Sequence, residues 1–509
     1  MIIRGRDLGR DFEDDADAVI VGSGAGGGMA LRELARAGLK VIALEEGGYH
    51  TPADFNQREE QMLSLLFHDG GARTTADRAV RVLTGRGVGG STIHNTNLCK
   101  RTPPEILDLW ARKYGVIGCT EKELAPVFAE VERDLSVREI PEQQRNGNNQ
   151  VLARGVKAIG YHGGPLKHNR VGCRESGFCD LGCSYDAKQN VTKVLLPDAF
   201  AAPGKAVVMS DVKATRVEHK AGAVTGVMGV ATDRAGNPVA KVKLKAKVVV
   251  LAASAVGSPA LALASDLPDP HGLTGRGLRL HPGAAIAGFF GDRIDGVYGI
   301  PQSYECTEFL DLHEGSERRV WITTAFAHPI GAAASLPGFG PSHMTLMRRY
   351  SHMAVLTAMV HDEGEGRVTL GEEGAPRLEY NLAEADRAQL VLGLRGAARI
   401  LLAAGAREVL LGTIPPLRLT KILDVDRITA DIVGPHKLPL LSVHPMGTMH
   451  FGEDPTKSIV KSTGEHHGVR GLFVLDGSLF PTSIAVPPQI SIYAFARLLA
   501  KHVVDRARG

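Results

Sequence analysis

The sequence predicts an α/β protein with a Rossmann-like parallel sheet and an inserted α+β region. An apolar strand at residues 18–21 runs into a glycine-rich turn and then a helix. Residues 247–259 and 471–478 each contain another apolar strand followed by a glycine turn, although they lie far along the chain. A chain of 509 residues is also too long for one simple core. Together these observations indicate one sheet assembled from distant segments, with a second unit between them.

The first turn has the spacing of a dinucleotide-binding loop. Gly22, Gly24 and Gly27 follow the pattern G-x-G-x-x-G, and a second strand after the helix ends at Glu45. Gly22 permits a tight turn, Gly24 lets a pyrophosphate approach the backbone, and Gly27 lets helix and strand pack closely. The helix N-terminus favours phosphate, and Glu45 can accept hydrogen bonds from ribose hydroxyls. The ordered flanking elements favour this interpretation over a chance glycine turn.

Composition limits the expected partners and location. The net charge is +3, from 59 basic and 56 acidic residues, and no long basic run occurs, so we expect no nucleic acid partner. The nearly apolar run at 248–265 is interrupted by Gly257, Ser258 and Pro259, which predicts a strand and a helix rather than a transmembrane segment. No signal-peptide pattern occurs, and six cysteines are few for a disulfide scaffold. We therefore expect a cytoplasmic protein.

A second glycine-rich stretch, GRGVGGSTIHN at 85–95, would let backbone lie against a flat cofactor ring and a pyrophosphate. Flavoproteins commonly assemble one dinucleotide fold from scattered segments, which favours FAD over NAD. We assign to the FAD site, besides the first loop and Glu45, the residues Arg86, Gly89, Gly90, Ser91, His94, Asn95, Val212, Asp476 and Gly477.

These segments resemble the glucose-methanol-choline (GMC) oxidoreductase family. Residues 85–95 look like its first signature, and 254–265 look like its second, although Asp266 stands where a glycine is usual. Residues 443–452, 471–483 and 366–382 resemble further blocks in the expected order, nearest in pattern to long-chain alcohol oxidases and cholesterol oxidase-like members. The resemblance implies FAD and oxidation of an alcohol by hydride transfer to flavin N5.

The resemblance identifies His444, in VHPMGT, as the catalytic histidine, and a histidine suits removal of a hydroxyl proton. The family's second catalytic residue, a histidine or asparagine, is replaced by Pro487, which offers no hydrogen-bond donor. Gln489 and Asn97 are candidates to supply the missing bond, and His281 lies in a stretch that could border the site. A helix is predicted from Gln489 onward.

His94 raises a separate question. A member of the family that resembles this stretch attaches its FAD covalently through a histidine at the matching position. Covalent attachment at His94 is therefore one expectation, and simple packing or hydrogen bonding against the cofactor is the other.

Cys173, Cys179 and Cys183 have the spacing C-x5-C-x3-C. Long-chain alcohol oxidases carry a similar stretch, with a cysteine where Ser176 stands here, and some glucose-dehydrogenase relatives hold a [3Fe-4S] cluster on such cysteines. A [3Fe-4S] cluster, free structural thiols and a Cys179–Cys183 disulfide all remain open.

The expected FAD-binding domain comprises residues 1–105, 190–285 and 440–509, and the substrate domain comprises 106–189 and 286–439. The expected substrate is an apolar small-molecule alcohol, such as a sterol or fatty alcohol, with oxygen or a redox protein or quinone as the electron acceptor. The rival functions are a flavin-containing lyase of the same fold and a non-catalytic flavin electron-transfer protein, which Pro487 makes conceivable.

Overall fold

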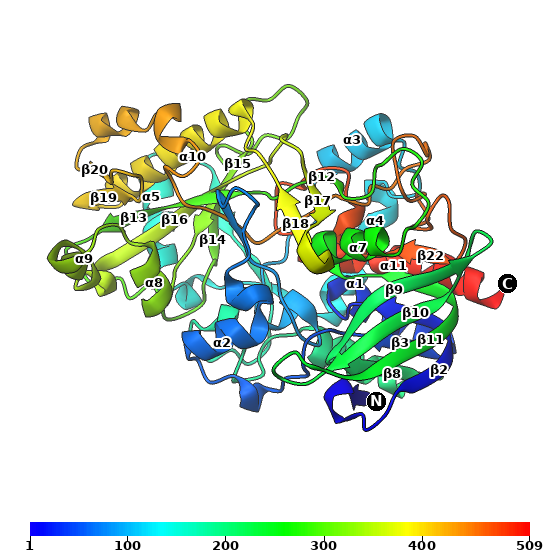
Figure 1. Cartoon of the computed structure of the whole chain (residues 1–509). Coiled ribbons are helices and arrows are strands. Elements are labelled where there is room, and N and C mark those ends of the chain that lie inside the picture. The colour runs from blue at the N-terminus through cyan, green and yellow to red at the C-terminus, as the bar shows by residue number, and fades with distance from the viewer.

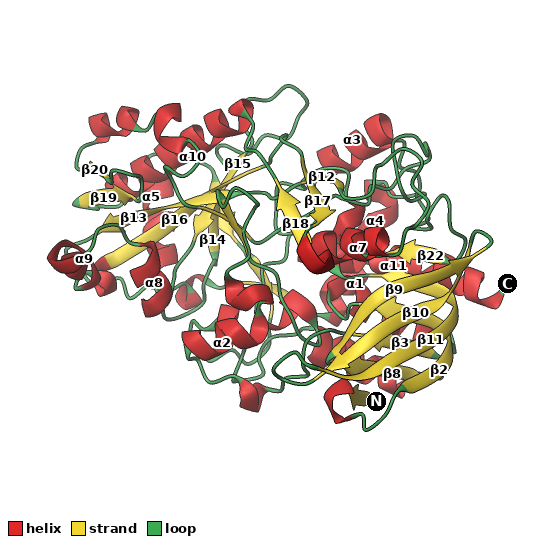
Figure 2. Cartoon of the chain, in the orientation of Figure 1, coloured by secondary structure: helices red, strands yellow, loops and turns green.

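The computed structural model describes residues 1–509 and contains two large sheets side by side, with helices packed around both (Figure 1, Figure 2). The first sheet has the strand order β1-β8-β3-β2-β11-β10-β9, and β22 pairs with the end of β11. Strands β1, β8, β3, β2, β11 and β22 run parallel, whereas β9, β10 and β11 form an antiparallel meander. These strands are β1 Ile2–Arg4, β2 Phe12–Val21, β3 Val41–Leu44, β8 Ala206–Ser210, β9 Val212–Lys220, β10 Ala223–Thr232, β11 Pro238–Leu251 and β22 Leu472–Val474.

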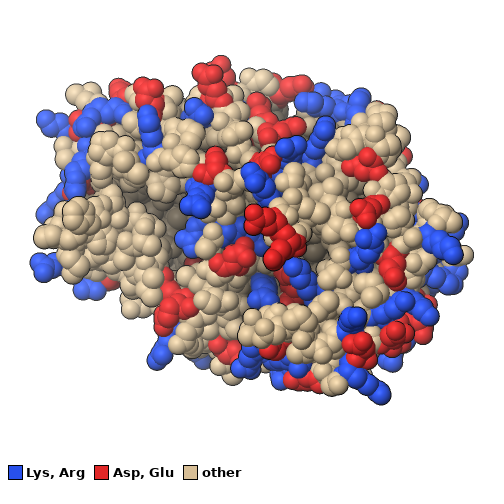
Figure 3. Space-filling model, in the orientation of Figure 1, with Lys and Arg blue, Asp and Glu red and all other residues tan.

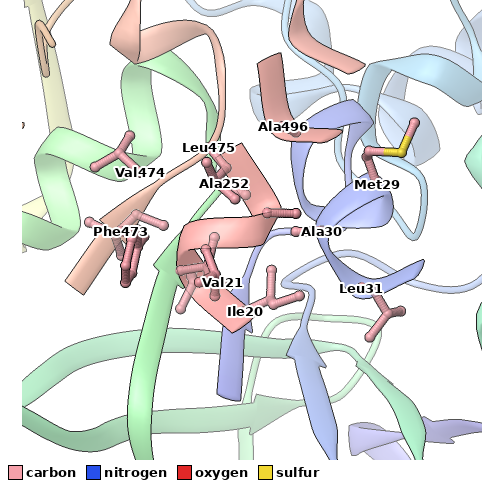
Figure 4. Packing of buried hydrophobic residues seen from close by; sticks show 14 of the residues in the cluster. Ile20, Val21, Met29, Ala30, Leu31, Ala252, Phe473, Val474, Leu475 and Ala496 are labelled. Carbon is pink, nitrogen blue, oxygen red and sulfur yellow. The ribbon is translucent and has the colours of Figure 1, made fainter. Parts of the chain in front are cut away.

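Helices cover the parallel part of this sheet. Helix α1 (Ala25–Arg36) packs against α11 (Gln489–Arg508) and α6 (Leu196–Ala201), and α11 also contacts α4 (Glu121–Asp134). Figure 4 shows Ile20 of β2, Met29 of α1 and Phe473 of β22 within this core. Burial of each such side chain stabilises the fold by about 1.5–3 kcal/mol. Because residues from near both ends of the sequence share this core, it holds the N-terminal and C-terminal segments together.

The second sheet has the order β20-β19-β13-β16-β15-β14-β6, with β21 and β4 attached beside β13. Helices α5 (Gly147–Ala158) and α10 (Glu384–Ala403) pack on one face, where they contact Leu356 and Ala358 of β16. The strands are β4 Val80–Val82, β6 Gly163–Pro165, β13 Gly283–Phe289, β14 Tyr304–Cys306, β15 Val320–Thr324, β16 Met353–Val360, β19 Glu408–Leu411, β20 Leu417–Leu419 and β21 Leu440–Ser442.

Smaller elements complete the fold. Strands β12 (Arg276–Leu278), β17 (Gly366–Leu370) and β18 (Pro376–Glu379) form a three-stranded sheet, and β5 (Val137–Glu139) pairs with β7 (Lys167–Asn169). The remaining α-helices are α2 Glu59–Leu66, α3 Pro104–Tyr114, α7 Ser254–Ala264, α8 Pro329–Ser335 and α9 Gly340–Met347. No helix combines the length and the apolar character that crossing a bilayer requires.

The predicted fold class is confirmed by this combination of a Rossmann-like parallel sheet and a second, largely antiparallel sheet with its own helices. The nearly apolar run at 248–265 forms the end of β11 and helix α7, as predicted. The exact domain boundaries stay a prediction. Strands β4 and β21 lie in segments predicted for the first domain, yet they pair within the second sheet.

Candidate active site

The first glycine loop joins β2 to α1 through backbone contacts that leave no room for a side chain at Gly22 or Gly27. Gly22 has a φ of 96°, and a Cβ there would overlap the carbonyl oxygen of Ala252. A Cβ at Gly27 would overlap the carbonyl oxygen of Gly22. Gly24 is the N-cap of α1 and provides no side-chain cap, so the first N–H groups of the helix stay free for an anion.

The second glycine loop lies directly against the first. Gly89 and Gly90 have φ values of 97° and 53°, and a Cβ at Gly90 would lie 2.9 Å from the Cα of Gly24. The Gly89 N–H donates to the Ser23 hydroxyl at 3.0 Å. The two stretches predicted to bind the cofactor therefore meet at the N-terminus of α1.

Glu45 connects both loops to the sheet. Its carboxylate accepts hydrogen bonds from the Ser23 N–H and hydroxyl, at 3.1 and 2.7 Å, and from the N–H groups of Gly47 and Gly87, at 3.0 and 3.2 Å. Burial raises its pKa to about 6, although these donors oppose the shift. Val212 lies beside it and donates its N–H to the Glu45 carbonyl.

Other predicted cofactor residues lie around the second loop. The Ser91 hydroxyl accepts a hydrogen bond from the Gly85 N–H at 2.9 Å, and the Asn95 amide donates to Gln489 at 2.5 Å. Arg86 borders a pocket of about 460 Å³, which Gly47, Gly48 and Asp211 also line.

His94 is buried against Phe67, with ring centroids 4.1 Å apart. Its Nε2 atom is buried without a hydrogen-bond partner. Burial lowers its pKa to about 3, and the charge of Lys188 adds to the shift. The ring is therefore neutral at pH 7, with one buried nitrogen available for a bond.

Asp476 and Gly477 follow β22 and lie against the first turn of α1, where a Cβ at Gly26 would overlap the Leu475 carbonyl. The Asp476 carboxylate accepts hydrogen bonds from Ser254, Ser258 and Ser478, so it fixes the start of α7. Burial raises its pKa. The side chain is thus engaged by the protein, which leaves the Asp476–Gly477 backbone as the part that could face a cofactor.

His444 lies on the loop that follows β21, and this loop is tied to the cofactor loops because the Gly447 N–H donates to the Gly477 carbonyl at 3.1 Å. The His444 ring is half-buried, and its Nε2 makes no hydrogen bond within the protein. Burial lowers its pKa to about 3. A neutral imidazole with a free nitrogen can accept a proton from a substrate hydroxyl.

The other ring nitrogen of His444 contacts His281, a residue that the sequence predicted only to border the site. His281 Nδ1 lies 3.2 Å from His444 Nδ1, and the rings stack with centroids 5.2 Å apart. His281 is fully buried. Each histidine stands in a copy of the pattern L-x-(L/V)-H-P, at 278–282 and 441–445, and this repetition is the signal by which the pair could have been found.

Of the residues considered as substitutes for the lost second catalytic side chain, Gln489 is hydrogen-bonded elsewhere, whereas the buried Oδ1 atom of Asn97 has no hydrogen-bond partner. Pro487 precedes α11, which begins at Gln489 as predicted. The Gln489 amide accepts from Asn95 and donates to Leu98 and Asn169. Asn97 lines a small pocket formed mainly by the cysteine segment. Neither side chain has a hydrogen bond to His444.

The three cysteines Cys173, Cys179 and Cys183 line one small pocket with Lys188, and all are free thiols. No group of three histidine, cysteine or acidic side chains is arranged to hold a metal ion. Burial raises the pKa of Cys179 to about 12, which favours the thiol over the thiolate that iron–sulfur ligation requires. The expected [3Fe-4S] cluster thus lacks support, and the Cys179–Cys183 disulfide is not formed.

The surface drawn in Figure 3 has basic and acidic side chains interspersed, without a continuous basic track. This mixed surface agrees with the small net charge and gives no indication of a nucleic acid partner.

Comparison with known proteins identifies the family. Two family models, both described as GMC oxidoreductase, match residues 63–283 and 362–496. An uncharacterized GMC-type oxidoreductase of Mycobacterium tuberculosis, Rv0492c, is 34% identical over 97% of this chain and 76% of its own length. The long-chain-alcohol oxidase FAO4B of Arabidopsis thaliana is 30% identical over 99% of this chain and 70% of its own.

Solved structures share the fold at low sequence identity. Pyridoxine 4-oxidase from Mesorbium loti superposes with a TM-score of 0.71 at 18% identity, covering 96% of this chain and 98% of that one. Formate oxidase of Aspergillus oryzae RIB40, in a variant studied for FAD modification, gives 0.70 at 16% identity, with 97% and 98% covered. The sequence motifs, the two-sheet fold and these matches agree, and the chain belongs to the GMC oxidoreductase family.

Proposed function

We propose that this protein oxidises an apolar alcohol to a carbonyl compound, with FAD as the hydride acceptor and His444 as the base. The observation that carries the proposal is the position of His444. A neutral imidazole with an unpartnered Nε2 lies on a loop that is hydrogen-bonded to Gly477, a residue assigned to the cofactor site. The similarity to long-chain-alcohol oxidases supports an apolar alcohol as the substrate.

The chain has groups suited to each part of FAD. Gly22 and Gly24, with the N-terminus of α1, would bind the pyrophosphate, and Glu45 would accept hydrogen bonds from a ribose. Gly89 and Gly90 would let the backbone lie close to the cofactor, because any side chain there would meet Gly24 or Ile93. When bound, FAD supplies the acceptor for the hydride that leaves the alcohol carbon.

His444 would take the proton of the alcohol hydroxyl at Nε2. The alcohol then loses one proton to the protein and one hydride to the cofactor, and a carbonyl compound is the product. Burial keeps the ring neutral before the reaction, so that its lone pair is available at pH 7.

We also propose that His94 bonds covalently to the cofactor through Nε2. The buried nitrogen has no partner in the protein, and a bond to a ring methyl carbon would satisfy it. Such a bond would replace one methyl C–H and the imidazole N–H, and the flavin itself would take up the two electrons and two protons released. Acid precipitation followed by mass spectrometry tests this. A chain mass increased by the flavin supports the bond, whereas an unmodified chain and a yellow supernatant exclude it.

The electron acceptor would be oxygen, in keeping with the relatives named as oxidases, or a redox protein or quinone. A cytoplasmic location fits the six free cysteines, since oxidising compartments favour disulfides.

Anaerobic mixing with a panel of alcohols tests the proposed reaction. Loss of the visible flavin absorption band on mixing is the expected result. Release of cyanide from hydroxynitriles with the flavin still oxidised would instead establish a lyase. A flavin that no alcohol in the panel reduces, but a redox protein does, would establish an electron-transfer protein.

A further inference from the structure

We propose that His281 is a positioning residue that holds the proton of His444 on Nδ1 and so keeps Nε2 as the base. This inference rests on the proposed function of His444. It gives His444 a supporting partner in a chain whose residue 487, a proline, has no side chain that could hydrogen-bond.

Backbone pairing places the two histidines opposite each other. Arg279 and Met446 form an antiparallel bridge with two hydrogen bonds, of 2.9 and 2.8 Å, and Gly283 pairs with Leu441. Counting two residues inward from the bridge along each chain leads to His281 and His444. The Ser442 hydroxyl donates to the Leu280 carbonyl at 2.5 Å and locks the two segments together.

His281 adopts a strained conformation that the surrounding structure maintains. Its φ is 46°, in the left-handed region that few non-glycine residues occupy. The Asp362 carboxylate accepts the N–H groups of Leu280 and His281 at 2.8 and 3.0 Å, and the Tyr380 hydroxyl donates to the same carboxylate at 2.9 Å. Such strain is typical of functional sites, and here it turns the ring toward His444.

When both imidazoles are neutral, the hydrogen bond between them has a single direction. With the Nδ1 atoms 3.2 Å apart, one must donate and the other accept. If His281 donated, the proton of His444 would lie on Nε2, and the nitrogen nearest the substrate could not act as a base. If His444 donates, its Nε2 carries a lone pair.

His281 is suited to be the acceptor. Its burial disfavours a charge on it, and His444 and His361 add to this effect, so the ring stays neutral although the Asp362 carboxylate accepts its backbone N–H. After His444 takes up the substrate proton, its Nδ1–H remains bonded to a neutral acceptor, which favours the charged ring. This contact offsets the burial that would otherwise make His444 a weak base.

Three variants separate this role from a merely structural one. His281→Ala removes the acceptor, and His281→Asn retains an oxygen near the position of Nδ1 and tolerates the left-handed conformation. His466→Ala is the matched control, because His466 is also a buried histidine but lies in the segment before β22. Thermal unfolding and bound FAD are measured for each, so that misfolded protein is recognised.

Stopped-flow flavin reduction gives the first readout. His281→Ala should slow reduction by about 10–100-fold, the range found when the hydrogen-bond partner of a metal-ligating histidine is lost. The apparent alcohol affinity should change little, and His281→Asn should recover most of the rate. Equal loss in both variants, or a loss confined to alcohol affinity, would overturn the proposal.

The second readout does not depend on turnover. Nitrogen NMR of ¹⁵N-histidine-labelled protein, assigned with the His444→Ala variant, reports which nitrogen of His444 carries the proton. We expect Nδ1 in the wild type and a large Nε2–H population in His281→Ala. A proton on Nε2 of His444 in the wild type would overturn the role of His281. This outcome can be distinguished from a failure of the proposed reaction, in which no alcohol would reduce the flavin.

Discussion

At the level of single residues, the candidate site depends on titratable groups, His444 and Glu45, that are removed from water. Burial takes the pKa of His444 down to about 3 and that of Glu45 up to about 6. Both shifts favour the neutral form. The surrounding donors and acceptors decide whether each group can still carry a charge when it acts.

Replacing His444 by Ala should slow flavin reduction by about 10²–10⁴-fold, the usual contribution of a positioned base. FAD should stay bound, because the contacts of the glycine loops do not involve this ring. Rapid-mixing absorbance measures the rate, and reduction as fast as in the wild type would contradict the assignment.

Replacing Glu45 by Gln should weaken FAD binding by about 10-fold or more, since a hydrogen bond to a charged group contributes about 1.5–3 kcal/mol. The amide nitrogen would also face N–H donors that the carboxylate now accepts. Titration of the apoprotein with FAD measures the change, and Glu46→Gln is the neighbouring control. Equal affinities of the two variants would argue against the role of Glu45.

At the level of elements, sequence patterns predicted those strands, turns and helices whose structure is determined by residues close together in the chain. The strand at 18–21, the glycine turn and helix that follow it, and the helix that begins at Gln489 follow from apolar spacing and from glycine and proline positions. Strand β2 itself begins earlier, at Phe12, because its acidic first half pairs with β11. The second sheet was predicted only as a class, because its antiparallel partners lie far apart in the chain.

The same limit applies to the candidate site. The glycine loops are local motifs, and the sequence indicated them directly. The contact of His281 with His444 depends on the pairing of two segments that are distant in sequence, so the repeated L-x-(L/V)-H-P pattern was the only sequence signal for it. The cysteines show the opposite failure, since a suggestive spacing is not accompanied by a metal-holding geometry.

Gly22 and Gly24 offer a matched pair of tests on one element. A Cβ at Gly22 would overlap the Ala252 carbonyl, so Gly22→Ala should destabilise the apoprotein by about 1–3 kcal/mol. A Cβ at Gly24 would meet only Gly90, at 3.9 Å, so Gly24→Ala should leave apoprotein stability unchanged and weaken FAD binding.

Denaturant unfolding and FAD titration of both proteins separate the two effects. A Gly24→Ala variant that binds FAD normally would show that the groove between the loops is not the pyrophosphate site.

At the level of the whole molecule, many histidines are buried in the neutral form. Burial lowers the pKa to about 3 for His94, His168, His361 and His444, and to about 4 for His68, His450 and His466. In the unfolded chain these rings would take up protons near the ordinary value of 6.5. Between these values the unfolded state binds more protons, so stability falls as the pH falls.

The apoprotein should therefore unfold within about two pH units below 6.5, because each ring contributes about 1.4 kcal/mol per unit against a total of about 5–15 kcal/mol. Glu45 and Asp362, whose pKa values are raised to about 6, act in the opposite direction but are fewer. Denaturant unfolding at pH 7, 6 and 5 measures the trend.

In the variant His466→Asn, the slope of stability against pH should decrease by about 1.4 kcal/mol per unit. An equal stability of the wild type at pH 7 and pH 5 would contradict this account.

The position of β22 in the first sheet has a consequence for synthesis in the cell. The strand comes from residues 472–474, and the Leu475 carbonyl that follows it closes against Gly26 near the start of the chain. A growing chain on the ribosome therefore cannot complete the cofactor groove until nearly all of it has been made. The apolar surface that β2 and α1 share with β22 and α11 stays uncovered until then, and exposed apolar surface of this kind makes an incomplete chain prone to aggregation.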